Sequence, residues 1–314
     1  MKLGFLYAGQ GTQHPGMGAD LYEAEPTFRA VIDAAADAVD FDLREVMFTD
    51  AQGVLTQTRY TQPCMVAFAA AMTATLAARG IVPAAAAGLS LGEYSALCAA
   101  KVFDADTAVR LAAFRGAAMT EAAVGHDSAM IAVLGADDEA LQAACREASS
   151  LGCAVVANYN CPGQRVLGGD RVAVEAAAAC AKQAGARRCI PLRVSGPFHT
   201  PLMAPAGQAL EEKFRSVTFG TPDIPVVFNC LGRTRQASDD DIPALLVRQV
   251  QSSVYMEDSI RAMADMGLDA IVEIGPGKAL SGFVKKTAPG LTVYAVETAA
   301  ELDELTKELQ NELC

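Results

Sequence analysis

The sequence predicts an α/β protein with a mostly parallel sheet and a subdomain inserted in its middle. Its 314 residues are 52% hydrophobic and 20% charged, which is enough apolar material for one large core with a subdomain, or for two domains. Short apolar runs alternate with longer helical patterns, as is typical of parallel sheets joined by helices. The middle of the chain departs from this alternation with the order β-α-β-β-α-β.

The larger part of the chain supplies the predicted parallel strands. Short apolar runs predict strands at residues 3–7, 85–89, 226–229, 270–274 and 292–296. Helices are expected between them, among them residues 93–100 and 105–122. The most apolar stretch, residues 64–78, is followed by Arg79 and falls short of the roughly 18 to 20 residues that cross a bilayer. We therefore expect a buried helix there and no membrane contact.

The middle of the chain predicts a ferredoxin-like subdomain. Strands are expected at residues 130–134, 154–158, 165–168 and 189–194, helices at residues 137–149 and 171–184, and a turn at residues 160–163. We place this subdomain at residues 126–198 and the core at residues 1–125 and 199–314. The subdomain holds seven acidic and seven basic side chains, so the net charge of −12 resides on the core.

Charge and cysteine content narrow the classes of function. With 25 basic and 37 acidic residues, a broad attraction for nucleic-acid phosphates is not expected, and an anionic partner needs a local basic patch. The first residues hold too short an apolar run for a signal peptide. Nine cysteines without a C-x-x-C pair favour reduced thiols. We expect a cytoplasmic protein that binds no nucleic acid.

A glycine-flanked motif marks Ser90 as a candidate nucleophile. Residues 88–92 read G-L-S-L-G and fit G-x-S-x-G, the sharp strand-to-helix turn that exposes a serine hydroxyl at the top of a sheet. An apolar run precedes the motif and a predicted helix follows it, whose first free amides favour a developing oxyanion. The alternative is a small-residue turn that arises by chance in a chain rich in alanine and glycine.

A serine nucleophile needs a base, and the chain has three histidines. His199 is the best placed, because it follows a predicted strand within turn residues that hold a side chain at the edge of a sheet. His14 is the second candidate, in a glycine-rich loop near the N-terminus. His126 is expected at the surface, at the subdomain junction. The alternative for each is a surface or buried histidine without a catalytic role.

Two further features indicate groups around the serine. The loop at residues 9–11, G-Q-G, follows a strand, but a dinucleotide fingerprint fails because His14 replaces its third glycine. An oxyanion-hole loop fits better, since glycines let backbone amides approach closely. Arg115 lies on a mostly apolar predicted helix and requires an anion, which is either an internal acid such as Glu121 or a substrate carboxylate.

Together these motifs resemble the malonyl-CoA:acyl carrier protein transacylase family over nearly the whole chain. The resemblance rests on residues 9–13 (G-Q-G-T-Q), 16–18 (G-M-G), 88–97 (G-L-S-L-G-E-Y-S-A-L), 115–116 (R-G), 158–164 (N-Y-N-C-P-G-Q), 196–199 (G-P-F-H), 249 (Q) and 273–277 (E-I-G-P-G). It implies an α/β-hydrolase-like core with a ferredoxin-like insertion, which agrees with the order of the predicted elements.

The resemblance also implies catalytic roles. Ser90 resembles the nucleophile and His199 the base, and the backbone amides of Gln10 and Leu91 resemble the oxyanion hole. No metal or bound cofactor is implied. The acyl group passes from malonyl-CoA to the serine and then to the phosphopantetheine thiol of an acyl carrier protein, which gives ping-pong kinetics.

The same resemblance implies how the substrate is bound. Arg115 resembles the residue that binds the free carboxylate of malonate, Gln249 one that orients the histidine or the active-site water, and Asn160 a substrate-binding residue. Phe198 before the histidine and Leu91 after the serine resemble malonyl-selective members rather than methylmalonyl-selective ones.

The sequence also departs from the family pattern. Leu89 stands where a histidine commonly precedes the serine. After Gln249, Ser253 and Met256 occupy what are usually a proline and an aromatic position, which makes the Gln249 assignment less direct.

The implied function is malonyl transfer for fatty acid synthesis by a monomeric protein. Because carrier proteins of this type are acidic, we expect docking near the basic residues Lys182, Arg187, Arg188, Lys285 and Lys286. The alternatives are a malonyltransferase that serves polyketide assembly, a serine acyl hydrolase that passes the acyl group to water, and a non-catalytic subunit that binds acyl-CoA or the carrier protein.

Overall fold

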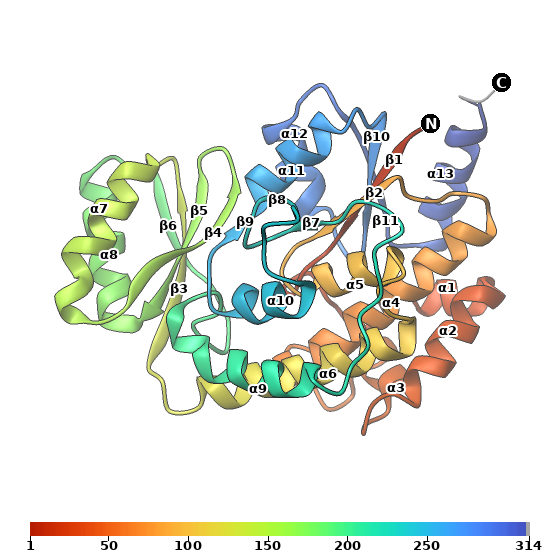
Figure 1. Ribbon diagram of the computed structural model, residues 1–314, viewed down its shortest axis with the longest axis horizontal. Coiled ribbons are helices and arrows are strands. Elements are labelled where there is room, and N and C mark those ends of the chain that lie inside the picture. Colours follow the sequence, from red (N-terminus) through yellow and green to blue (C-terminus); the bar gives the residue numbers. More distant parts are fainter. Residues whose placement is uncertain (312–314) are drawn as a thin grey trace.

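Four parallel strands form the sheet at the centre of the larger part of the chain (Figure 1). The computed structural model describes residues 1–311. The strands are β1 (Leu3–Tyr7), β2 (Ala85–Gly88), β10 (Ala270–Ile274) and β11 (Thr292–Val296), in the order β11-β10-β1-β2. The predicted parallel sheet is confirmed. Every residue of β1, β2 and β10 is buried, as expected for strands covered on both faces.

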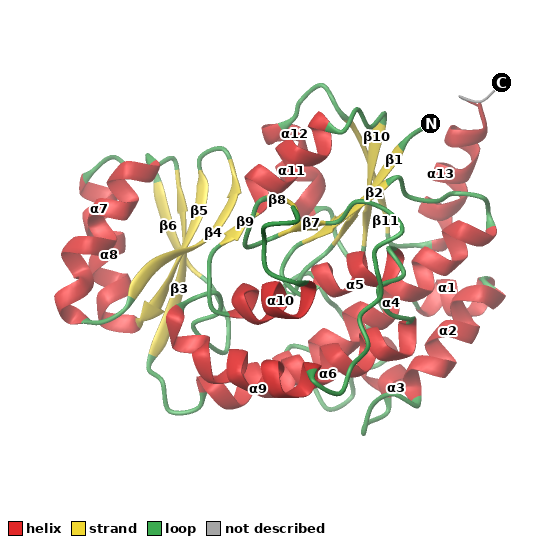
Figure 2. Ribbon diagram, in the orientation of Figure 1, coloured by secondary structure: helices red, strands yellow, loops and turns green. Residues whose placement is uncertain are grey.

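Helices cover both faces of this sheet (Figure 2). The helices of this part of the chain are α1 (Ala19–Ala24), α2 (Pro26–Ala36), α3 (Leu43–Phe48), α4 (Thr58–Ala78), α5 (Gly92–Ala99), α6 (Ala105–Ala123), α9 (Ala204–Phe214), α10 (Ile242–Val250), α11 (Met256–Asp265), α12 (Ala279–Thr287) and α13 (Ala299–Asn311). Side chains alternate between the faces: Leu6 packs in the cluster with α11 and α12, whereas Phe5 and Tyr7 pack in the larger cluster with α4 and α13.

The apolar helix α4 is longer than the sequence analysis predicts. It begins at Thr58 and has 21 residues, so by length and composition alone it could cross a membrane. However, 78% of its most apolar 18-residue window is buried inside the protein. The length argument was therefore wrong, whereas the expectation of a buried helix is confirmed by its packing.

The segment predicted as a core strand at residues 226–229 adopts a different arrangement. Strand β7 (Val227–Phe228) pairs antiparallel with β8 (Arg233–Thr234), and a single bridge between Ala86 and Val226 links it to the main sheet. The chain turns away because the amides of Leu231 and Gly232 bond back to the Phe228 carbonyl, and Gly232 has a φ of 64°.

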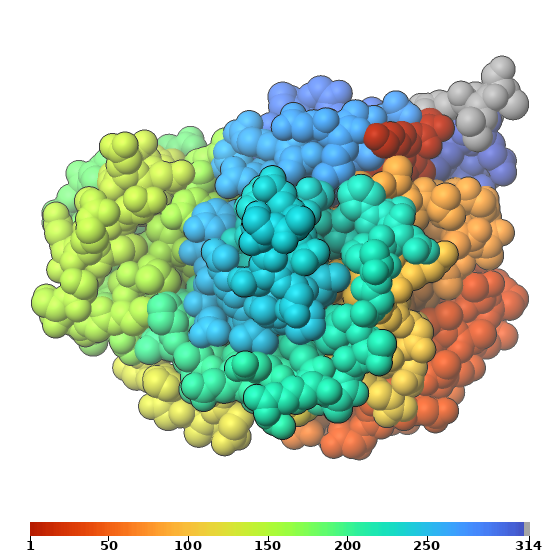
Figure 3. Space-filling view, in the orientation of Figure 1, coloured from red at the N-terminus to blue at the C-terminus, as the bar shows by residue number. Residues whose placement is uncertain are grey.

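The middle of the chain folds around its own hydrophobic cluster and forms a separate lobe (Figure 3). Its elements are β3 (Ser128–Leu134), α7 (Asp138–Ala148), β4 (Ala154–Cys161), β5 (Gln164–Asp170), α8 (Arg171–Gln183) and β6 (Arg188–Pro191). Short 3₁₀ helices occur at Ser149–Leu151 and Pro201–Met203. Within the lobe the strand order is β6-β3-β5-β4 with antiparallel neighbours, which confirms the ferredoxin-like order.

Three details of this lobe differ from the sequence analysis. Strand β6 ends at Pro191, so residues 192–194 of the strand predicted at residues 189–194 lie outside it. Strand β4 continues through Asn160 and Cys161, so only Pro162 and Gly163 form the turn, with Gly163 at a φ of 72°. A fifth strand, β9 (Val254–Tyr255), comes from the C-terminal part of the chain and pairs parallel with β4. No pattern in the sequence indicated it, because two residues show no periodicity. The boundaries at residues 126 and 198 stay a prediction.

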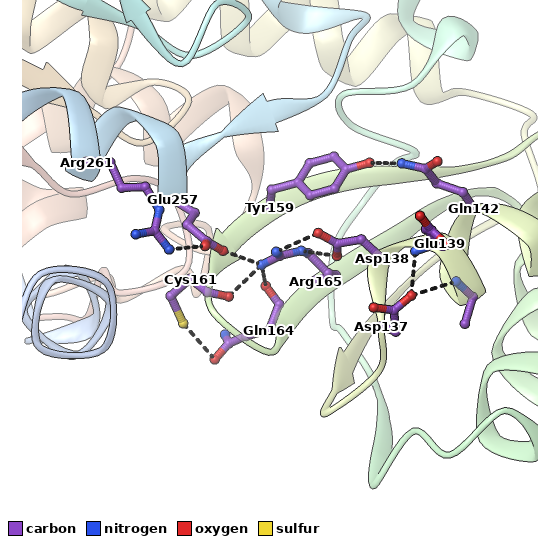
Figure 4. Close-up of polar contacts among 11 residues, drawn as sticks. Asp137, Asp138, Glu139, Gln142, Tyr159, Cys161, Gln164, Arg165, Glu257 and Arg261 are labelled. Atoms are coloured by element: carbon purple, nitrogen blue, oxygen red, sulfur yellow. Dashed lines mark hydrogen bonds and ion pairs between the residues drawn. The ribbon is translucent and has the colours of Figure 1, made fainter.

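A buried arginine joins the lobe to the core (Figure 4). Arg165 on β5 makes two hydrogen bonds of 2.7 and 2.9 Å to Asp138 and an ion pair of 2.8 Å to Glu257 on α11. Beside it, the rings of Tyr159 and Tyr255 stack with centroids 5.2 Å apart. Together with β9, these contacts fix the subdomain sheet relative to helix α11 of the core.

Candidate active site

Ser90 lies at the sharp turn between β2 and α5. Its φ is 55°, in the left-handed region that a non-glycine residue adopts at an energetic cost. Both flanking glycines are required by space: a Cβ on Gly88 would overlap the carbonyl of Gly92, and one on Gly92 would overlap the carbonyl of Tyr7. The G-x-S-x-G pattern therefore adopts the strand-to-helix turn that the sequence analysis expects.

His199 is the histidine that contacts this serine. Its Nε2 lies 2.7 Å from Ser90 Oγ, and its Nδ1 lies 2.9 Å from the carbonyl oxygen of Gln249. Because a carbonyl can only accept, Nδ1 carries the proton and Nε2 is free to accept the proton of the serine. His14 instead pairs with Glu297 at the surface, and His126 is exposed.

The surroundings of His199 keep its ring uncharged. Burial and, after it, the nearby positive charge of Arg115 together lower the pKa of His199 to about 4, against the raising effect of the hydrogen bond to Gln249. At neutral pH the ring is therefore an unprotonated base in contact with the serine hydroxyl.

Arg115 on α6 is fully buried beside the serine. Its Nη1 donates to Gln62 Oε1 at 2.9 Å, and its Nη2 donates to Gln249 Oε1 at 2.9 Å and to Ser90 Oγ at 3.1 Å. The guanidinium also lies 5.6 Å from the centre of the Tyr94 ring. Burial lowers the pKa of Arg115.

No carboxylate of the described chain forms an ion pair with Arg115, and its Nε meets no acceptor there. Glu121, the internal acid considered from the sequence, is exposed. A buried cation held only by neutral oxygens leaves charge available for an anionic ligand.

The peptide after Ser90 is held in one orientation. The carbonyl of Ser90 accepts a hydrogen bond of 2.9 Å from Gln249 Nε2. Because the carbonyl and the following amide of a trans peptide point in opposite directions, the Leu91 amide points away from Gln249. Within residues 1–311 neither this amide nor that of Gln10 meets an acceptor. Both are therefore available to an oxyanion.

A cavity of about 160 Å³ opens in front of these groups. It is lined by Gln10, Gln62, Leu89, Ser90, Met119, Met130, Asn158, Asn160, Val166, Leu192, Val194, Phe198 and His199. Asn160 is buried, and its Oδ1 meets no hydrogen-bond donor in the described chain. The walls come from both the core and the lobe, so the junction at Arg165 also sets the shape of this cavity.

The sequence analysis missed Gln62 and Asn229. Gln62 precedes the apolar run of α4 but follows the mostly polar residues 57–61, so no pattern singled it out. Asn229, at the end of β7, accepts a hydrogen bond of 2.6 Å from the Ser90 amide, and no motif pointed to it.

The remaining expectations concern the surface and metal binding. The five basic residues proposed for docking are all exposed: Lys182, Arg187, Arg188, Lys285 and Lys286. The eight cysteines within residues 1–311 are free, and Cys314 lies outside the described residues. Among the described residues no group of three or more His, Cys, Asp or Glu side chains is arranged to hold a metal ion. The absence of a cofactor stays a prediction.

Comparison with known proteins places these features in a family. A family model for the acyl transferase domain matches residues 4–312. A Bacillus subtilis protein named malonyl CoA-acyl carrier protein transacylase is 38% identical, covering 99% of this chain and 98% of its own. The Escherichia coli K12 protein of the same name is also 38% identical, covering 94% of this chain and 96% of its own.

Solved structures agree with this likeness. The crystal structure of MCAT from Streptococcus pneumoniae is 45% identical with a TM-score of 0.93, covering 98% of this chain and 100% of its own. A second matching chain comes from the structure of a type II PKS acyl-carrier protein in complex with its malonyl-transacylase. It is 35% identical with a TM-score of 0.93, and the match covers 98% of this chain and 100% of that chain.

The lowered pKa of His199 predicts how Ser90 reactivity depends on pH. Labelling of Ser90 by methanesulfonyl fluoride requires neutral His199, so its rate should stay constant from pH 8 down to about pH 5 and fall about tenfold per pH unit below about pH 4. Intact-mass measurement of the adduct follows the rate, with Ser90→Ala as the unlabelled control. A midpoint near the ordinary histidine value of about 6.5 would contradict the proposed environment of the ring.

Proposed function

We propose that this chain transfers malonyl groups from malonyl-CoA to an acyl carrier protein. The chain belongs to the acyl transferase domain family, and within it to the malonyl CoA-acyl carrier protein transacylases. One observation carries the proposal at the level of chemistry. Ser90 Oγ contacts both a neutral base, His199, and a fully buried cation, Arg115. The first activates a nucleophile, and the second selects an acyl group that carries its own negative charge.

In the first half-reaction, Ser90 Oγ attacks the thioester carbonyl carbon and His199 Nε2 accepts the hydroxyl proton. The oxyanion accepts hydrogen bonds from the amides of Gln10 and Leu91. The carbon–sulfur bond then breaks, and the departing CoA sulfur takes the proton from His199. A malonyl ester on Ser90 remains.

The second half-reaction reverses these steps with a new thiol. The phosphopantetheine thiol of the carrier protein gives its proton to His199, and its sulfur attacks the ester carbon. The bond between that carbon and Ser90 Oγ breaks, and the serine oxygen takes the proton back. Every proton passes through one imidazole, and this sequence of steps requires no metal or redox cofactor.

Arg115 is proposed to bind the free carboxylate of the malonyl group. Its Nη1 has a second hydrogen beyond the one used by Gln62, and its Nη2 releases Ser90 Oγ when that oxygen becomes an ester. The two nitrogens then form a fork for two carboxylate oxygens. Acetyl-CoA offers no such group, so it leaves the buried cation unpaired.

Gln249 and Asn160 are proposed to support this arrangement. The Gln249 side chain accepts from Arg115 and donates to the Ser90 carbonyl, while its own carbonyl orients His199. This gives Gln249 three contacts within the site rather than one. The Asn160 side chain lines the cavity with a free acceptor, which suits a donor on the thioester or on the phosphopantetheine arm.

A second candidate for the biological role is supply of polyketide assembly. The complex of a type II PKS acyl-carrier protein with its malonyl-transacylase has the same TM-score to this chain as the Streptococcus pneumoniae structure. The chemistry is the same in both roles. Fatty acid synthesis, a cytoplasmic location and a monomeric state therefore stay predictions about the cell.

Intact mass after brief incubation with malonyl-CoA tests the proposed transfer. The wild-type chain should gain one malonyl group, Ser90→Ala should gain none, and holo acyl carrier protein should discharge the adduct onto its own thiol. An adduct that is lost to water equally fast without carrier protein would support the hydrolase instead. No adduct at all would support the non-catalytic binding subunit.

The carrier protein is proposed to dock where β6 leads into the cavity wall. Arg187 and Arg188 are exposed at the start of this edge strand, and Leu192 and Val194 just beyond it line the cavity. The other proposed basic residues, Lys182, Lys285 and Lys286, are exposed on helices α8 and α12. An acidic carrier protein docked here would bring its thiol arm to the cavity that holds Ser90.

Charge reversal tests this surface. Replacing Arg187 and Arg188 by Glu should raise the KM for carrier protein by about tenfold at low salt and leave the KM for malonyl-CoA unchanged. The matched control is the same reversal at Arg110, which is exposed on α6 and pairs with Asp106. Equal KM values for carrier protein in the wild type, the Arg187 and Arg188 double variant and the Arg110 variant would refute docking at β6.

A further inference from the structure

The strained conformation of Ser90 needs a group that holds it, and Asn229 supplies one. The side chain of Asn229 bridges the turn: its Oδ1 accepts from the Ser90 amide at 2.6 Å, and its Nδ2 donates to the Gly88 carbonyl at 2.6 Å. One amide group thus holds the backbone on both sides of Leu89. Only a side chain with both a donor and an acceptor makes this bridge.

The backbone of Asn229 extends the same contacts. Its amide donates to Glu93 Oε2 at 2.6 Å, and Glu93 lies in the first turn of α5, just after the serine. Its carbonyl accepts from the Tyr255 amide of β9 at 2.9 Å. Asn229 is fully buried and uses all four of its polar groups. It therefore connects the turn, helix α5 and the strand that joins the lobe.

We propose that Asn229, held by Glu93, is a positioning residue that sets the orientation of the Ser90 peptide for catalysis. The Asn229 side chain accepts the hydrogen bond of the Ser90 amide. The amide of the next residue, Leu91, therefore remains as the oxyanion donor. The proposal rests on the malonyl transfer proposed above. It assigns a role to two buried polar residues that do not line the cavity.

The state of Glu93 is consistent with this role. Glu93 is fully buried, and its Oε1 meets no donor in the described chain. Burial raises the pKa of Glu93 to about 7, while the Asn229 amide and the positive charge of Arg115 oppose the rise. The groups that act on this buried carboxyl are the Asn229 amide, Gln249 and Arg115, which all belong to the surroundings of Ser90.

Substitutions at Asn229 separate positioning from simple stability. Asn229→Ala should lower the rate of Ser90 malonylation on the order of 100-fold with little change in the KM for malonyl-CoA. Asn229→Asp should lose a similar factor at pH 8 but recover to within about tenfold of wild type at pH 5.5, because a protonated Asp again has a donor for Gly88 and an acceptor for Ser90. Burial and the neighbouring Glu93 carboxyl favour the protonated form of that Asp, and the positive charge of Arg115 opposes it.

Conservative variants and a structural control complete the experiment. Glu93→Gln keeps an acceptor for the Asn229 amide and should retain the rate within about threefold, whereas Glu93→Leu should lose it. Thr75→Ala removes a buried hydrogen bond of 2.8 Å to the Ala71 carbonyl, near the end of α4 that lies away from Gln62, and should lower the unfolding temperature without lowering the rate.

The outcomes distinguish this inference from the proposed function. If Asn229→Ala retains the wild-type rate, or if the ratio of Asn229→Asp to wild type does not change with pH, the positioning role is wrong. If the wild-type chain forms no malonyl ester, the proposed function fails. Labelling of Ser90 by methanesulfonyl fluoride in the same variants then still tests the role of Asn229.

Discussion

The buried positive charge of Arg115 is the constraint around which the site is built. Removing a guanidinium from water costs several kcal/mol unless it is paired, and within residues 1–311 this one donates its hydrogen bonds to the neutral oxygens of Gln62, Gln249 and Ser90. Those three residues come from α4, α10 and the turn before α5, so the charge holds three distant segments together. In the proposed function, the free carboxylate of the malonyl group supplies the missing negative charge.

The fold meets this constraint with rigid supports on each side. Strand β2 ends at Gly88, two residues before Ser90, the Gln249 carbonyl fixes the tautomer of His199, and Asn229 accepts a hydrogen bond from the Ser90 amide. Ser90 and His199 both have positive φ angles, of 55° and 61°. Such strain persists only where the surroundings determine the conformation fully, as hydrogen bonds do here. The contacts of Arg165 and strand β9 fix the opposite wall of the cavity.

Residues that belong to local motifs could be predicted from the sequence, and residues brought in by tertiary contacts could not. Ser90 stood in a motif whose glycines have a steric reason, and His199 was one of only three histidines. Gln62, Asn229 and strand β9 gave no such pattern, because each acts through a partner far along the chain. The strand predicted at residues 226–229 was assigned to the wrong sheet for a related reason. An apolar run indicates that a strand is buried but not which strand it pairs with.

Kinetics of Arg115→Ala with malonyl and acetyl thioesters test the central claim most directly. The ratio of the two kcat/KM values cancels the amount of active protein, and Arg110→Ala on the same helix controls for loss of a charge. If the buried cation selects the substrate, the preference for malonyl should fall on the order of 100-fold in Arg115→Ala and stay unchanged in Arg110→Ala. An unchanged preference in Arg115→Ala would contradict the claim that this charge is completed by the substrate carboxylate.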